Sequence, residues 1–464
     1  MPTAFYTRRL PHLYYILLAA LALVYYKERI IHIDVAAYFY HIVQYKTFTT
    51  PHDRFISIFT QLLPLAGAHA GLSLKALLLL YSVSFVLFSY IIYLLLTRVF
   101  DQPFAGMVNA VVAVTGVFAG FFYPVSEVFL AVSMLCLLLG FCLSERALAY
   151  PPWLYWPVFI LLLFLTFTAH SMIVPPLFIC MAAVMIFGKK FPLQNGFIGF
   201  AILFFLVVVK FLTLSGYERE FGMEMRKGIT KLAEFRTFMS YRYLAAGGWK
   251  IIAPAGIFMI INSIVLLMKA RRKFFLWYFA GMVVLFLLSL CTYYRGYYGV
   301  NVLEIAFYPL VFFSLLPLVF YPELFQRRNL LLAVISASVL FSVYQVYALG
   351  KRQKKITLLK NHVISDARNQ GGNKFYACPR TLPVRLEACW SFGVETLLLS
   401  SLYDPENTVT IYFIDDPEIL KRRNDPYFIF ISHFENGSDR DTRKLDRRYF
   451  RGMEGYYNEL RKTY

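Results

Sequence analysis

The chain has 464 residues, of which 59% are hydrophobic and only 16% are charged. Because charged residues make up about 25% of an ordinary soluble domain, this composition excludes a soluble globular protein and indicates that lipid is the main solvent. The net charge of +19 would favour nucleic acid as the partner of a soluble protein. Here the basic residues lie mostly in loops and near the C-terminus, so contact with anionic or phosphorylated lipids is the simpler interpretation.

Apolar runs long enough to cross a bilayer recur along most of the chain. A helix of about 20 residues spans the ~30 Å hydrocarbon core. The runs lie at 11–26, 72–96, 104–122, 126–143, 153–169, 171–187, 196–215, 251–268, 274–294, 302–320 and 329–349. The sequence therefore predicts an all-α polytopic membrane domain over residues 1–350, with about eleven transmembrane helices and an uncleaved first helix.

The short loops that carry basic residues predict the orientation, since lysine and arginine collect on the cytoplasmic side. With the N-terminus in the cytoplasm, every second short loop is basic. These loops contain Arg8 and Arg9, Arg98, Arg146, Lys189 and Lys190, residues 269–273, and Arg327 and Arg328. A multi-pass cell-membrane protein is predicted, with segments 27–71, 216–250 and 351–464 on the extracytoplasmic side.

Two of these outer segments have amphipathic patterns. In 27–71, apolar Val35, Phe39 and Ile42 recur at helical spacing opposite Asp34 and Tyr38, which is typical of a helix on the membrane surface. A second short helix is predicted to begin near 50–53, where threonine precedes proline. Segment 216–250 is predicted to form a basic amphipathic helix against the outer leaflet.

The composition becomes polar after residue 350. Segments 373–378, 408–414 and 427–434 have the pattern of strands, and 390–403 that of a helix, so a small soluble α/β domain is predicted over 351–464. Its charged, aromatic end is either a docking helix or a loose tail. Cys378 and Cys389 could form a disulfide there, a possibility the sequence leaves open. The other four cysteines lie in apolar runs as small hydrophobes.

Ionisable residues are almost absent from the middle of the predicted spans, which disfavours an ion-driven transporter. They gather instead at the outer helix ends and loops, where one aqueous site could hold them all. These residues are Asp34, His52, Asp53, Arg54, Glu127, His170, Lys210, Arg295 and Glu304.

Each of these residues also has a purely structural interpretation. Asp34 could be a solvated helix residue, and Asp53 and Glu127 occupy helix starts, where the macrodipole favours an anion. His170 could cap a turn, while Lys210 either extends to the interface or meets an anion. Arg54 and Arg295 could likewise contact only headgroups or neighbouring aromatic rings. No nucleotide-binding loop, zincin helix, nucleophile elbow or metal-ligand spacing is present.

The layout resembles the GT-C superfamily of membrane glycosyltransferases, which take sugars from polyprenyl-phosphate carriers. The resemblance covers residues 1–350. It rests on "HIDVAAYFYHI" after the first span, "LSLKALLLLYSV" entering the second, the short "YPVSE" turn at 123–127, and "RGYYGVNVLEIAFYPLVFF" before the closing span. Val35 follows the aspartate where many such enzymes have a second acid, which leaves a metal-assisted version in doubt.

The resemblance implies an inverting transfer in which Asp34 deprotonates an acceptor hydroxyl. Lys210, Arg295 and Arg54 would hold the phosphate of the donor. The supporting residues would be Asp53, His52, Glu127, His170, Glu304, Tyr38 and His41. No cofactor is expected besides the lipid-linked sugar, and the partners are membrane lipids and a glycan, lipid or protein acceptor. Two other classes remain open: a non-catalytic translocase or polymerase partner for lipid-linked glycans, and a membrane assembly protein.

Overall fold

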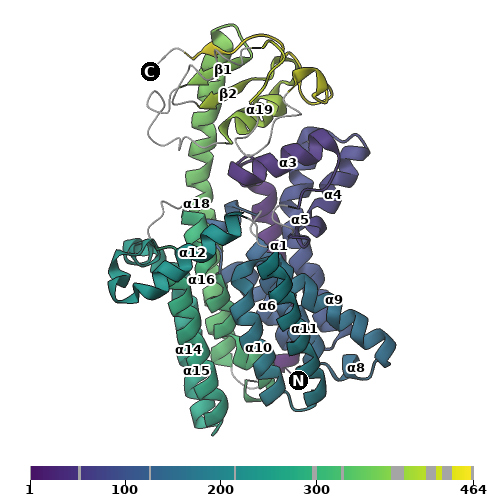
Figure 1. Ribbon diagram of the computed structural model, residues 1–464, viewed down its shortest axis with the longest axis vertical. Helices are drawn as coiled ribbons and strands as arrows, with labels where there is room; N and C mark the ends of the chain where they lie inside the picture. The colour runs from purple at the N-terminus through teal and green to yellow at the C-terminus, as the bar shows by residue number, and fades with distance from the viewer. Residues whose placement is uncertain are drawn as a thin grey trace.

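The computed structural model describes residues 2–50, 54–124, 127–213, 216–294, 300–325, 329–377, 391–413, 425–430 and 441–460. Within these ranges the chain is mostly α-helical, with one three-stranded sheet near its C-terminal end. Figure 1 shows a bundle of long helices, with the sheet and its helix α19 at the end of the molecule opposite the N-terminus.

The helices of the bundle run back and forth along its long axis (Figure 1). They are α1 (Pro2–Val24), α5 (Leu74–Leu94), α6 (Pro103–Thr115), α7 (Glu127–Leu143), α9 (Pro152–Ala169), α10 (Val174–Phe187), α11 (Leu193–Leu212), α14 (Trp249–Met268), α15 (Arg272–Cys291), α16 (Val300–Ser314), α17 (Leu316–Phe320) and α18 (Asn329–Asn369). The short helix α8 (Glu145–Leu148) connects α7 and α9.

Seven helical segments of the described chain are long and apolar enough to cross a membrane. They are Leu74–Val99, Pro152–Ala169, Leu193–Leu212, Met239–Met268, Arg272–Cys291, Leu303–Phe320 and Leu331–Asn369. The spans expected at 104–122, 126–143 and 171–187 correspond to apolar helices of 10–17 residues. The first of these, α6, ends at Thr115 because Gly116 begins a loop. Eleven spans therefore stay a prediction, and a mostly α-helical membrane protein is what the structure supports.

The outer surface of the bundle is strongly apolar. Large side chains such as Ile16, Phe204 and Phe211 are 63%, 68% and 73% exposed. Exposed apolar side chains of this number and size are unfavourable in water, and lipid tails would cover them in a bilayer. The four cysteines of the apolar runs, Cys136, Cys142, Cys180 and Cys291, are free and buried.

The basic loops lie together at the N-terminal end of the bundle, which we call the basic end. Asp101 accepts from both Arg8 and Arg146, at 3.0 and 3.4 Å. Lys190 pairs with Glu145 at 2.6 Å, Lys189 with Glu323 at 3.0 Å, and Arg271 lies over the ring of Tyr321. The described basic loops therefore gather at one end of the bundle.

At the opposite end, segment 27–71 forms three helices, α2 (Tyr26–Ile30), α3 (Ile33–Tyr45) and α4 (Ser57–His69). The expected apolar stripe of α3 is present, with Val35, Phe39 and Ile42 fully buried. It packs inside the protein, against α5 and α19, instead of lying on lipid.

Segment 216–250 is not one continuous amphipathic helix. It consists of α12 (Gly216–Thr230), a 3₁₀ turn (Leu232–Thr237), α13 (Met239–Tyr243) and a π-type turn (Leu244–Gly248) that leads into α14. The break before α14 occurs at Gly247, whose φ of 113° is accessible to glycine at little cost.

Helix α18 is 41 residues long and continues through position 350, where the sequence placed a domain boundary. It leads into strand β1 (Lys374–Ala377), helix α19 (Phe392–Tyr403), and strands β2 (Thr410–Phe413) and β3 (Asn458–Glu459). The sheet has the order β2-β1-β3 and is parallel throughout, with Phe375 opposite both Ile411 and Asn458.

The third predicted strand, at 427–434, is wrong for the residues that the structure describes there. Residues 425–430 form only an isolated bridge, from Phe428 to Asp441, and β3 takes the third place in the sheet. The segment 441–460 is neither of the two predicted alternatives. It packs through short turns on α3, where Phe450 lies against Tyr40, and on the turn after α4, where the Tyr449 hydroxyl donates to the carbonyl of Leu72 at 2.8 Å. Cys378 and Cys389 lie outside the described residues.

Candidate functional site

Asp34 lies in the first turn of α3, after an unusual backbone turn. His32 is extended, and Ile33 has a φ of 43°, in the left-handed region that a β-branched residue rarely adopts. Such a conformation costs roughly 1–3 kcal/mol and persists only where surrounding contacts enforce it. The backbone that presents Asp34 is therefore held in place by its neighbours.

Glu395 of α19 makes the contact that holds this turn. Its Oε1 accepts the backbone N–H of Ile33 at 2.6 Å, while its Oε2 pairs with the Lys360 ammonium at 2.6 Å. Lys360, on α18, also donates to the carbonyl of Ile31 at 3.4 Å. Both charged side chains are almost fully buried. The C-terminal part of the chain thus fixes the backbone on which Asp34 is mounted.

The electrostatics of this contact follow from burial and from the Lys360 charge. Burial pushes the pKa of Glu395 upward, but Lys360 and its hydrogen bonds outweigh this and leave the pKa below its ordinary value. Burial, and then Lys360, lower the pKa of His32 to about 4. At neutral pH the site therefore has an ionised Glu395 beside Lys360, and a neutral His32.

A loop between α6 and α7 reaches Asp34 from the other side. Tyr123, in this loop, donates its hydroxyl to Oδ2 of Asp34. The loop is shaped by Glu304 of α16, whose buried carboxylate accepts the N–H groups of Phe118, Ala119 and Gly120 at 3.1, 2.9 and 2.7 Å. Glu304 therefore acts on the site through the loop.

Arg54 and Glu127 form a buried salt bridge beside Asp34. The guanidinium of Arg54 donates to Glu127 at 2.8 Å, and the two side chains are 11% and 5% exposed. Burial, followed by the charges of Glu127 and Glu395, raises the pKa of Asp34 to about 7, and Arg54 opposes this shift. Tyr38, one turn along α3, faces the same charges, and burial raises its pKa too.

The structure brings together some of the predicted site residues and separates others. Asp34, Tyr38, Arg54 and Glu127 influence one another. His41 is almost two turns from Asp34 and hydrogen-bonds Thr47. His170 caps the turn Ser171–Ile173 by accepting the N–H of Met172, the structural role that the sequence left open.

Lys210 forms a separate pair with Glu218 of α12 at 2.8 Å. The anion that the sequence anticipated near Lys210 is therefore a side chain of the protein. His52, Asp53 and Arg295 lie outside the described residues. No group of three or more histidine, cysteine, aspartate or glutamate side chains placed to bind a metal occurs in the part of the chain that the structure describes.

Sequence reasoning missed Tyr123, Lys360 and Glu395. One signal was available for Glu395: it is the only charged residue in the otherwise apolar run "WSFGVETLLLSSLY", and burying an isolated charge is costly without a partner. Tyr123 begins the short turn at 123–127, in which sequence reasoning identified only Glu127 as a candidate.

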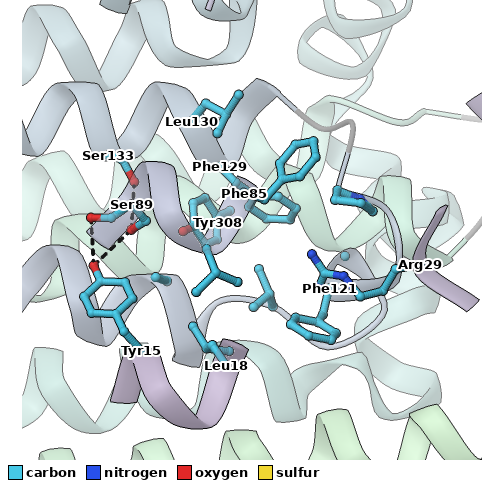
Figure 2. Close-up of a pocket in the computed structure, with 15 residues that line it drawn as sticks. Tyr15, Leu18, Arg29, Phe85, Ser89, Phe121, Phe129, Leu130, Ser133 and Tyr308 are labelled. Atoms are coloured by element: carbon cyan, nitrogen blue, oxygen red, sulfur yellow. Dashed lines mark hydrogen bonds between the residues drawn. The ribbon is translucent and has the colours of Figure 1, made fainter. Parts of the chain in front are cut away.

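A cavity lies next to the loop that carries Tyr123 (Figure 2), with an empty volume of about 540 Å³ including its open part. Its walls come from α1, α5, α6, α7 and α16. They include Tyr15, Leu18, Phe85, Val86, Leu130 and Tyr308, with Arg29 at one side.

Comparison of the chain with known protein families, with curated proteins and with solved structures found no match. The chemistry of the site must therefore be argued from its residues. A carboxylate whose pKa lies near neutrality is half ionised at physiological pH. It is well suited to accept a proton from a bound hydroxyl group.

Proposed function

We propose that this protein is a membrane glycosyltransferase of the GT-C type, which moves a sugar from a polyprenyl-phosphate carrier to a hydroxyl group of an acceptor. The observation that carries the proposal is the environment of Asp34. It is half-buried beside the Arg54–Glu127 pair, has a pKa of about 7, and lies on a backbone turn held by Glu395. Perturbed carboxyl groups of this kind are concentrated at catalytic sites.

In the proposed reaction Asp34 is the general base. Tyr123 occupies Oδ2, so Oδ1 is the oxygen that takes the proton from the acceptor hydroxyl. The hydroxyl oxygen forms a bond to the anomeric carbon from the face opposite the phosphate. The bond between that carbon and the phosphate oxygen breaks, and the lipid phosphate leaves with the electron pair. The anomeric configuration is inverted.

The leaving phosphate requires positive charge nearby. Of the predicted phosphate-binding residues that the structure describes, Arg54 lies beside Asp34, and it already holds Glu127. That pairing fixes the orientation of the guanidinium, since one of its edges is occupied. Lys210 is paired with Glu218 in a separate group.

We place the site on the extracytoplasmic side, because it lies at the end of the bundle opposite the basic end. Lysine- and arginine-rich short loops stay in the cytoplasm. A reporter that is active only in the cytoplasm, fused after Tyr464, is expected to be silent. A strong signal would reverse the orientation.

The decisive experiment is sugar transfer from a polyprenyl-phosphate donor by purified protein in detergent. Asp34→Asn keeps the size and polarity of the side chain but removes its ability to accept a proton. Transfer should fall by ~10²-fold or more, the usual scale for loss of a general base. The matched control is Asp101→Asn, which changes an aspartate at the basic end and should leave the rate unchanged.

If wild type transfers sugar and Asp34→Asn keeps most of that rate, Asp34 is a structural residue and the base must be sought at Glu127 or Asp53. If wild type transfers nothing to a range of acceptors but binds the donor, a non-catalytic role with lipid-linked glycans is favoured.

A further inference from the structure

Arg29 is a deeply buried charged residue that the proposed reaction does not use. It lies on α2 and is only 2% exposed, which makes it one of the most deeply buried large side chains of the protein. Its Nη2 donates to the carbonyl of Ser82 at 3.2 Å, and its guanidinium stacks on the ring of Phe121 at 3.8 Å. Figure 2 shows the guanidinium directed toward the other residues of the cavity.

Two nitrogen atoms of this guanidinium have no acceptor within the described part of the chain. Nε and Nη1 are buried without a hydrogen-bond partner among the described residues. Within the described residues, Arg29 forms no salt bridge with a carboxylate, and this includes the carboxylate of its neighbour Glu28. Burial lowers the pKa of Arg29 to about 9, which still leaves it charged at neutral pH.

An unpaired buried charge is strongly unfavourable, and proteins almost always supply a counter-ion. Two other buried cations at this end of the molecule have such a counter-ion: Arg54 and Lys360 hold carboxylates at 2.8 and 2.6 Å. Arg29 differs from them in that it borders a cavity. The missing counter-ion is therefore expected to be an anion that enters the cavity.

The rest of the cavity indicates what the anion is attached to. Leu18, Phe85, Val86 and Leu130 form apolar walls. The polar groups at its far side are already satisfied, because Asn109 donates to Tyr15 at 2.8 Å and Tyr15 in turn hydrogen-bonds Ser89. A free inorganic ion would leave these apolar walls without contacts. A chain carrying the anion at its end would cover them.

We infer that Arg29 and this cavity bind the phosphate group of a single-chain lipid phosphate together with the first carbons of its chain. The choice of phosphate rests on the function proposed above, and arginine is well suited to it because its donors remain charged and planar. The site is adjacent to the chemistry. Phe121, which stacks on Arg29, and Tyr123, which contacts Asp34, belong to the same loop.

The test measures binding without turnover. The full chain in detergent is titrated with a polyprenyl monophosphate, with the matching polyprenol and with inorganic phosphate, and thermal unfolding is followed. A ligand that binds only the folded protein raises the unfolding temperature in a concentration-dependent way. We expect this rise with the lipid phosphate and little with the other two.

Arg29→Met is expected to weaken this binding about tenfold or more, the scale for losing a hydrogen-bonded charge. The matched control is Arg352→Met, which removes an exposed arginine from α18 and should bind as wild type. Without ligand, Arg29→Met should be as stable as wild type or more so, because it removes an unpaired buried charge. A purely structural arginine would instead give a less stable variant.

Two further variants keep the test decisive if Arg29→Met fails to fold. Ala113→Leu fills the cavity while leaving Arg29 in place and should weaken binding of the lipid phosphate, whereas Arg29→Lys keeps the charge and should retain part of it. Asp34→Asn should bind normally even though it is inactive, so failure of the proposed reaction can be told apart from failure of this site. Equal protection by inorganic phosphate or by polyprenol, or unchanged binding by both Arg29→Met and Ala113→Leu, would overturn the inference.

Discussion

Two groups of charged residues lie at the end of the bundle away from the basic loops, and they are built differently. The Asp34 group, which comprises Asp34, Arg54, Glu127, Lys360 and Glu395, has ion pairs whose side chains are 2–11% exposed. The Lys210 group, which comprises Lys210, Glu218, Glu224 and Lys227, has lysines that are 29% and 59% exposed.

The difference lies in how much each charge depends on its partner. A buried ion cannot be solvated, so its protonation and position are set by the protein. An exposed ion is stabilised by water whether or not its partner is present. Reactivity at neutral pH is therefore expected in the Asp34 group, and the Lys210 group is expected to serve the surface of the protein.

The largest expected effect comes from breaking the pair between the C-terminal part and α3. Lys360→Met leaves the buried Glu395 without a counter-charge, which should lower the free energy of unfolding by about 3–5 kcal/mol. The matched variant in the Lys210 group is Lys227→Met, which breaks an exposed pair three residues apart along a helix and should cost about 0.2–0.5 kcal/mol. Thermal or denaturant unfolding in detergent measures both. Similar losses of unfolding free energy in the two variants would show that burial does not make the Asp34 group more dependent on its ion pairs than the Lys210 group.

A second expected effect concerns Asp34 and pH. Its pKa is about 7 in the folded protein against an ordinary value of 3.8. Between these values the folded state binds more protons than the unfolded state, so this group makes stability fall as pH rises from about 4 to 7. Asp34→Asn removes the effect. Its advantage in stability over wild type should therefore grow across that window and level off above it.

The control for this titration is Asp101→Asn, whose exposed carboxylate is paired at the basic end. It should show no advantage that increases with pH. An advantage of Asp34→Asn that is the same at pH 4 and pH 8 would mean that the carboxyl group of Asp34 is not protonated at neutral pH in the folded state.

Much of the bundle could be predicted from the sequence, because apolar runs bounded by charges or glycines determine helices locally. Asp34, Arg54 and Glu127, which the sequence places at outer helix ends or in outer loops, lie near one another in the structure. The third strand was not predicted. Residues 427–434 have strand composition, yet β3 is formed by Asn458 and Glu459, whose composition gives no such indication.

The partners of Asp34 could not be predicted, because they depend on packing between distant parts of the chain. Glu395 is 362 residues from Ile33, and Tyr123 is 89 residues from Asp34. No local pattern encodes such contacts. Glu304 illustrates the same limit. It was predicted to line the site, and the structure shows it accepting three backbone N–H groups that shape the loop of Tyr123.

A smaller effect is expected for the hydrogen bond from Tyr123 to Asp34. The hydroxyl favours the ionised carboxylate, so Tyr123→Phe should raise the pKa of Asp34, by about one unit on the usual scale for a hydrogen bond to a charge. The acidic limb of the rate profile should move to higher pH by that amount. Tyr344→Phe, which removes an exposed hydroxyl from α18, is the control and should leave the profile in place.

The smallest effect is expected for Lys210, and it tests whether the Lys210 group is as independent of its partners as its exposure predicts. Lys210 is paired with Glu218 and is 29% exposed, so Lys210→Met should change the free energy of unfolding by no more than about 1 kcal/mol. If Arg29 holds the lipid phosphate, the affinity for a polyprenyl monophosphate should also stay within about twofold of wild type. Glu218→Gln serves as the control, because it removes the carboxylate that pairs with Lys210 and would leave Lys210 available to bind the donor phosphate. Tighter lipid-phosphate binding by Glu218→Gln together with a tenfold loss in Lys210→Met would place Lys210 at the donor site, and the two groups would then form one site.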